Sequence, residues 1–139
     1  MTLSPIDIHG EDEMAALGAD IAAILLPGDR IGLVGDLGAG KTTLARAIIR
    51  ALADDPALEV PSPTFTLVQP YDETRIPVRH ADLYRVADPM EVDELGLGEP
   101  DAAELIEWPK AALPVTLAID FAPGDDTARR VTVTAPEGF

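Results

Sequence analysis

Residues 35–42 read Gly-Asp-Leu-Gly-Ala-Gly-Lys-Thr, which fits the phosphate-binding pattern G-x-x-x-x-G-K-[ST] at every fixed position. Glycines let such a loop turn its backbone N–H groups toward phosphate oxygens, and the helix that follows presents the positive end of its dipole. In this pattern Lys41 reaches the outer phosphates and the Thr42 hydroxyl binds Mg²⁺. The residues expected to hold the phosphates are Leu37, Gly38, Ala39, Gly40, Lys41, Thr42 and Thr43.

The sequence on either side of the loop has the order that phosphate binding requires. Residues 30–34 form a short apolar run that is typical of a buried strand. Residues 43–53 predict a helix, because apolar residues such as Leu44 and Ile48 recur three and four positions apart. A strand, a glycine loop, Lys-Thr and a helix therefore follow one another directly.

The rest of the chain predicts an α/β fold. A strand near residues 4–9 and a helix over residues 11–26, ending at Pro27-Gly28, come before the loop. After it we expect a hairpin of residues 65–71 and 77–83, a short helix at 89–95, and strands at 104–108, 115–120 and 130–134. The prediction is one P-loop NTPase-like domain over residues 1–139. Its sheet is mixed, parallel around the loop and antiparallel at the hairpin, with flanking helices.

Composition narrows the possible classes of partner. The chain has 139 residues and no cysteine, and its longest apolar stretch, Ile21–Pro27, is far too short for a bilayer span. With no visible secretory signal, we expect a cytoplasmic protein that does not enter a membrane. The formal net charge of −15 argues against direct, strong binding of nucleic acid. The acidity fits either a solvated surface or docking onto a basic protein.

Nucleotide hydrolysis also needs a carboxylate for Mg²⁺ and a group that orients water. Three acidic residues end apolar runs: Asp82, Glu107 and Asp120. Asp120 follows the longest apolar run and is the best match by pattern, although a carboxylate at a strand end before a turn is still the preferred interpretation. Spacing alone does not rank the three.

Three further motifs occur downstream in a fixed order. They are Ser62-Pro-Thr-Phe-Thr-Leu-Val68, His80-Ala-Asp-Leu-Tyr-Arg85 and Ile106-Glu-Trp-Pro109. Together with the P-loop, this set closely resembles the TsaE (YjeE) family over about residues 6–133. The resemblance implies a small P-loop ATPase that uses ATP and Mg²⁺. It also implies an accessory role beside TsaD and TsaB proteins in forming threonylcarbamoyladenosine (t6A) in tRNA, with the tRNA reached only through that complex.

The resemblance also implies roles for individual residues. Thr42 and Glu107 match the magnesium ligands, and Asp82 matches the catalytic-site aspartate, so Lys41, Asp82 and Glu107 are the expected catalytic residues. Residues 62–66 match a switch-like loop, within which the Thr64 hydroxyl suits contact with a third phosphate.

Other matched positions keep two interpretations. Trp108 is either a core aromatic or a ring that shields the site from water or stacks near the nucleotide. Arg130 is either near the adenine or simply a strand-end charge. His80 fits a hydrogen-bonded strand residue better than a base. Ala81 departs from the family, which usually has a bulky aromatic there, and the short C-terminus puts contacts from a longer tail in doubt.

Two functions of other classes share the opening motif. A small-molecule kinase is one, but the chain shows no arginine-rich lid segment. A nucleotide-binding scaffold without hydrolysis is the other, and the intact Lys41-Thr42 pair argues against it. No arginine stands out as a built-in finger, so we expect slow turnover by the isolated chain and stimulation by a partner.

Overall fold

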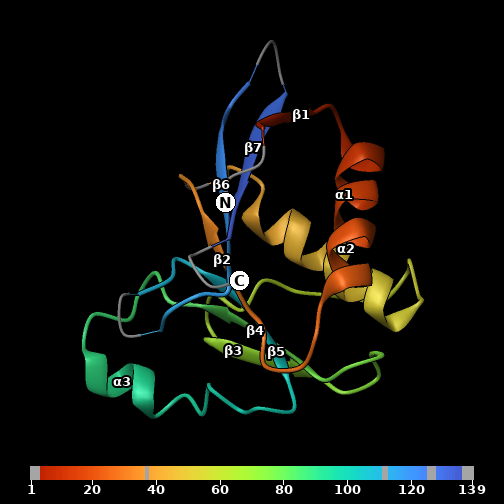
Figure 1. Ribbon diagram of the computed structural model, residues 1–139. Helices are drawn as coiled ribbons and strands as arrows, with labels where there is room; N and C mark the ends of the chain where they lie inside the picture. The colour runs from red at the N-terminus through yellow and green to blue at the C-terminus, as the bar shows by residue number, and fades with distance from the viewer. Residues whose placement is uncertain (1–3, 37, 111–112, 125–127, 136–139) are drawn as a thin grey trace.

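The computed structural model describes residues 4–36, 38–110, 113–124 and 128–135. Within them, seven strands form one sheet in the order β1-β7-β6-β2-β5-β4-β3. The strands are β1 (Ile6–Ile8), β2 (Arg30–Val34), β3 (Val68–Tyr71), β4 (Val78–Asp82), β5 (Ala103–Glu107), β6 (Leu117–Pro123) and β7 (Arg129–Thr134). The helices are α1 (Glu11–Ile24), α2 (Lys41–Ala53) and the short α3 (Pro89–Asp93). Helices α1 and α2 lie side by side next to the sheet, and α3 lies apart from them (Figure 1).

The sheet is parallel at its centre and antiparallel at both edges. β2 lies between β5 and β6 and is parallel to both, and β4 extends the parallel group beyond β5. This confirms the mixed α/β sheet with parallel strands around the loop. The predicted hairpin forms one edge, where β3 runs antiparallel to β4. A second antiparallel group, β6-β7-β1, forms the other edge and was not expected from the sequence.

Two apolar clusters cover the sheet. The larger one joins α1 and α2 to the central strands and contains the fully buried Leu44 and Ile48. The two helices approach closely at Gly18, where a Cβ atom would lie 2.6 Å from the Cβ of Ala47. The smaller cluster gathers Leu83 and Val92 with Ile106 of β5. Helix packing on the first face therefore holds α2, and with it the loop before α2, against the end of β2.

Two predicted strands have different limits. The strand expected from residue 65 begins at Val68, because residues 63–66 form a turn and Leu67 has a positive φ of 68°. Phe65 is consequently 81% exposed. The strand expected at 115–120 is β6, which extends to Pro123 because β7 pairs with it as far as that residue. Asp120 thus lies inside a strand and not at its end.

The other elements match their predictions to within about two residues. Among the described helices, none has both the length and the apolar character needed to cross a membrane.

Candidate active site

The loop between β2 and α2 depends on two glycines in left-handed backbone conformation. Gly38 has a φ of 77°, and Gly40, the N-cap of α2, has a φ of 110°. A Cβ on Gly40 would also lie 3.4 Å from the methyl carbon of Met14 on α1. Glycine is favoured here because residues with a Cβ rarely adopt this conformation. The motif spacing therefore reflects the backbone shape needed to begin α2 at Lys41.

Lys41 lies under the loop and is only 4% exposed. Its Nζ donates hydrogen bonds to the carbonyl oxygens of Gly35 at 2.6 Å and Asp36 at 2.7 Å. The same nitrogen is 4.3 Å from the ring centroid of Trp108, which is cation–π distance. Burial lowers the pKa of the Lys41 ammonium, and nearby carboxylates, first that of Glu107, oppose this shift. A cation is thus held at the place where the motif predicts outer phosphates.

Asp82 and Glu107 lie at the carboxyl ends of adjacent parallel strands. They are register partners between β4 and β5, and they are only 7% and 3% exposed. The Thr42 hydroxyl donates to Oε1 of Glu107 at 2.7 Å. The Tyr84 backbone N–H donates to Oδ1 of Asp82 at 3.0 Å. The structure therefore brings together Thr42, Asp82 and Glu107, which lie far apart in the sequence.

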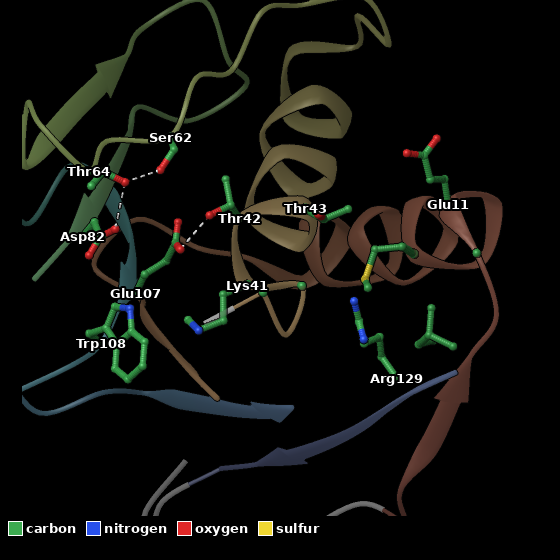
Figure 2. Close-up of a pocket in the computed structure, with 15 residues that line it drawn as sticks. Glu11, Lys41, Thr42, Thr43, Ser62, Thr64, Asp82, Glu107, Trp108 and Arg129 are labelled. Atoms are coloured by element: carbon green, nitrogen blue, oxygen red, sulfur yellow. Dashed lines mark hydrogen bonds between the residues drawn. The ribbon is translucent and has the colours of Figure 1, made fainter. Parts of the chain in front are cut away.

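The segment around Ser62 and Thr64 reaches the same place. The two hydroxyl oxygens are 2.7 Å apart, and Thr64 Oγ1 donates a longer bond of 3.4 Å to Oδ2 of Asp82 (Figure 2). The carbonyl of Leu67 accepts from the Asp82 backbone N–H at 2.9 Å. The position of the loop is thereby linked to the end of β4 through both backbone and side chain.

Trp108 covers the Lys41 side of the site. Its φ of 59° turns the chain sharply after β5, and its backbone N–H donates to the Leu33 carbonyl at 3.3 Å. The ring lies 4.7 Å from that of Tyr84, centroid to centroid, with the planes tilted by 56°. Trp108 is therefore next to the predicted phosphate site, as the shielding interpretation requires.

One cavity of about 420 Å³ brings together Lys41, Thr42, the hydroxyls of Ser62 and Thr64, the two strand-end carboxylates and Trp108. Figure 2 shows Ser62, Thr64, Asp82 and Glu107 at one end, and Glu11 and Arg129 at the other. The described lining residues are Ile8, Gly10, Glu11, Met14, Gly38, Gly40, Lys41, Thr42, Thr43, Ser62, Thr64, Asp82, Glu107, Trp108 and Arg129.

The donor atoms suit Mg²⁺. A hydroxyl oxygen from Thr42 and carboxylate oxygens from Glu107 and Asp82 are hard ligands. In the described part of the chain no group of three or more His, Cys, Asp or Glu side chains is placed to enclose a metal ion. Mg²⁺ is commonly held by one or two carboxylates together with substrate phosphates and water. The residues present fit that mode of binding.

The structure gathers most of the predicted site residues, but not all. Leu37 is outside the described residues, and Ala39 does not line the described part of the cavity. Arg130 also lies off the cavity, because its Nε donates to Oδ1 of Asp7 at 2.9 Å. Asp120 is exposed on β6, opposite Val34, and does not belong to this site.

Several lining residues were missed by sequence reasoning. Glu11 and Met14 come from α1, and Arg129 from β7, next to the predicted Arg130. No motif marks them, because they meet only when β1 and β7 pair at the sheet edge. Alternation along β7 is the one signal that separates Arg129 from Arg130, since adjacent residues point to opposite faces.

A family model described as "Threonylcarbamoyl adenosine biosynthesis protein TsaE" matches residues 8–131 of the chain. The chain belongs to the TsaE family. A Rickettsia bellii protein named as tRNA threonylcarbamoyladenosine biosynthesis protein TsaE is 36% identical over 133 residues, covering 91% of this chain and 92% of the relative. A Rickettsia felis protein of the same name is 40% identical over 103 residues, but the match covers 73% of this chain and only 60% of the relative.

The family relationship extends to three dimensions. The crystal structure of YdiB from Bacillus subtilis superposes with a TM-score of 0.76 at 29% sequence identity. The superposition covers 97% of this chain and 86% of the other. The chain therefore shares its overall α/β fold with that protein.

Proposed function

We propose that this chain binds and hydrolyses ATP with Mg²⁺ and serves as the accessory ATPase of t6A formation in tRNA. The observation that carries the proposal is the 2.7 Å contact between the P-loop hydroxyl of Thr42 and the strand-end carboxylate of Glu107. This contact puts the two expected magnesium ligands together at one end of the cavity. Membership in the TsaE family supports the biological assignment.

The proposed roles follow from where each side chain lies. The loop and the start of α2 bind the phosphates, and the Lys41 ammonium attracts the β- and γ-phosphates. Thr42 and Glu107 would hold Mg²⁺, which neutralises charge on those phosphates when it is bound. Asp82, one strand away from Glu107, orients the attacking water or a water bound to the metal.

The reaction needs no covalent intermediate on the protein. Water adds to the γ-phosphorus, and the bond to the β–γ bridging oxygen breaks with its electron pair remaining on ADP. Of the two protons of the water, one stays on the released phosphate and the other passes to solvent. The chain's contribution is positional and electrostatic, and it comes from groups that are largely out of water.

The segment at residues 62–66 is the proposed switch. A third phosphate at Thr64 changes the hydrogen bonds among Ser62, Thr64 and Asp82, and so changes the surface next to the cavity. Phe65 at its tip is 81% exposed, with the Arg85 guanidinium 4.7 Å from its ring. We propose that TsaD and TsaB proteins bind this surface and respond to its change. The tRNA is then bound by them and not by this acidic chain.

The test is ATP hydrolysis by the purified chain, alone and with TsaD and TsaB, together with t6A formation on tRNA in the same mixture. We expect slow release of phosphate alone, faster release with the pair, and t6A only when ATP and this chain are both present. The partner pair should bind the ATP-bound chain more tightly than the nucleotide-free chain. Equal affinity for the two forms would exclude the switch.

The same assay separates the alternatives. A small-molecule kinase would transfer the γ-phosphate to an added acceptor instead of to water. A scaffold would support t6A formation without releasing phosphate, and a Glu107→Gln variant would then be as effective as the wild type.

A further inference from the structure

His80 is a buried polar residue whose role the proposed reaction does not yet include. It lies on β4 two residues before Asp82, so both side chains are on the same face of the sheet. The side chain is 0% exposed. Its Nε2 is 2.6 Å from Oε2 of Glu107, a buried contact between neighbouring strands.

Glu107 is therefore held from two sides. Thr42 donates to Oε1 at 2.7 Å, and His80 contacts Oε2 at 2.6 Å. An ionised carboxylate only accepts hydrogen bonds, so with Glu107 ionised the donor in this contact is the Nε2 atom of His80. Because Glu107 is only 3% exposed, water does not readily replace the imidazole as a donor.

The other ring nitrogen of His80, Nδ1, indicates that the residue makes a single polar interaction. Nδ1 is buried and has no hydrogen-bond partner among the described residues. A buried polar atom without a partner costs stability. An apolar side chain would avoid that cost, and the contact made by Nε2 is the gain that offsets it. His80 is thus oriented by one interaction, directed at Glu107.

We propose that His80 is a positioning residue that holds the Glu107 carboxylate against Thr42, so that the two oxygens are already together when Mg²⁺ and nucleotide bind. The inference rests on the proposed function, because it concerns binding of magnesium at that site. Partners of this kind orient metal ligands, and their loss typically lowers metal affinity by about 10–100-fold. His80 touches neither nucleotide nor metal in this scheme and acts only through Glu107.

The experiment compares His80→Leu with His80→Gln. Leucine removes the donor, whereas glutamine carries an amide N–H at a similar distance from the backbone and serves as the conservative control. Binding of ADP is measured by calorimetry in Mg²⁺ and again in EDTA, so that the readout is independent of turnover. Mg²⁺ should raise the ADP affinity of the wild type, and we expect this increase to be about 10–100-fold smaller in His80→Leu. The ADP affinity measured in EDTA should change little. His80→Gln should keep most of the increase that Mg²⁺ provides.

The ADP titrations distinguish a failure of the proposed function from a failure of the proposed role of His80. If ADP binding by the wild type gains nothing from Mg²⁺, the proposed function and this inference both fail. If the wild type gains affinity and a folded His80→Leu gains as much, only the role of His80 is wrong. Equal losses in His80→Leu and His80→Gln would also overturn the role, because they would indicate a packing effect.

A measurement on the wild type avoids any failure of the variants to fold. The chain has two histidines, and the other one, His9, is exposed and serves as an internal reference for imidazole ¹⁵N spectra. We expect the spectrum to show a proton on Nε2 of His80. A bare Nε2 would contradict the hydrogen bond to Glu107 and with it the proposal.

Discussion

The two ends of the cavity are built in different ways. At the end that we call the phosphate end, formed by Lys41, Thr42, Thr64, Asp82 and Glu107, the three charged side chains are 3–7% exposed. At the end that we call the edge end, formed by Ile8, Gly10, Glu11, Met14 and Arg129, both charged side chains are exposed. The phosphate end comes from the parallel centre of the sheet and its loop. The edge end comes from the antiparallel strands β1 and β7 and the start of α1.

This difference separates two kinds of contribution. Charges held nearly out of water, with hydrogen bonds already made, act strongly on phosphate and do not need to reorganise during reaction. Exposed charges on surface elements are screened by water and salt, and each contributes little. Substitutions at the phosphate end should therefore change the chemistry, whereas those at the edge end should change affinity modestly.

The largest effect is expected for Lys41→Ala. Removing the buried cation expected to bind the phosphates should lower nucleotide affinity by at least about 10-fold, the contribution of one charged hydrogen bond. Hydrolysis should fall by more than the roughly 10²–10³-fold expected for the strand-end carboxylates, because both nucleotide binding and electrostatic stabilisation are lost. Because Trp108 is the only tryptophan and lies 4.3 Å from Lys41, its fluorescence during an ATP titration measures binding directly. Lys110→Ala is the matched control, since the chain has just these two lysines. Similar losses in both variants would mean that general charge, and not the buried site, binds ATP.

Substitution of the two strand-end carboxylates should reduce hydrolysis by about 10²–10³-fold, the range for losing one electrostatic contact in a site that excludes water. Glu107→Gln and Asp82→Asn keep the side-chain volumes, so nucleotide binding should partly survive. Phosphate release in single-turnover assays measures the loss. Asp120→Asn, exposed on β6, should hydrolyse ATP like the wild type. Normal hydrolysis by Glu107→Gln together with loss in Asp120→Asn would reverse the assignment of the carboxylates.

Sequence reasoning succeeded where local pattern and chemistry coincide. Residues 30–53 predicted the strand, the loop and α2 correctly, because glycine conformation and helix periodicity are local properties. Spacing left Asp82, Glu107 and Asp120 unranked, because register between strands is a long-range property, and only the family resemblance selected Asp82 and Glu107. In the structure, β6 continues three residues past Asp120, whereas β4 and β5 end together at the other two.

The edge end could not be predicted for a related reason. Its residues meet only through the pairing of β1 with β7, which joins segments more than 120 positions apart. The family resemblance placed Arg130 near the adenine, whereas alternation along β7 directs Arg129 to the cavity and Arg130 to Asp7. A shift of one residue in a strand exchanges its two faces, so a motif alone does not decide between neighbours.

An intermediate effect is expected for Thr64→Val, which keeps the shape of the side chain and removes the hydroxyl. One hydrogen bond contributes about 0.5–1.5 kcal/mol, so hydrolysis should fall about 3–10-fold. The difference in partner affinity between the ATP and ADP forms should fall as well, as measured by co-sedimentation with the TsaD–TsaB pair. For hydrolysis, Thr66→Val, on the exposed side of the same turn, is the control. If Thr64→Val discriminates ATP from ADP like the wild type, the hydroxyl is not the sensor of the third phosphate.

The smallest effects are expected at the edge end, and Arg129 and Arg130 separate its two possible roles. Arg129→Ala removes an exposed cation that lines the cavity, so ATP affinity should fall only about 2–5-fold, in line with up to about 1 kcal/mol for an exposed charge. The loss should shrink further at high salt, because water and ions screen such a contact.

Arg130→Ala should instead leave ATP affinity unchanged and lower the free energy of unfolding by no more than about 1 kcal/mol, because its ion pair with Asp7 is partly exposed. Calorimetric titration and urea unfolding of the two variants give the comparison directly. If Arg130→Ala lost affinity and Arg129→Ala did not, the nucleotide would contact the opposite face of β7. The cavity described here would then account for the phosphates alone, and the part of the site that surrounds the base would lie elsewhere on the sheet edge.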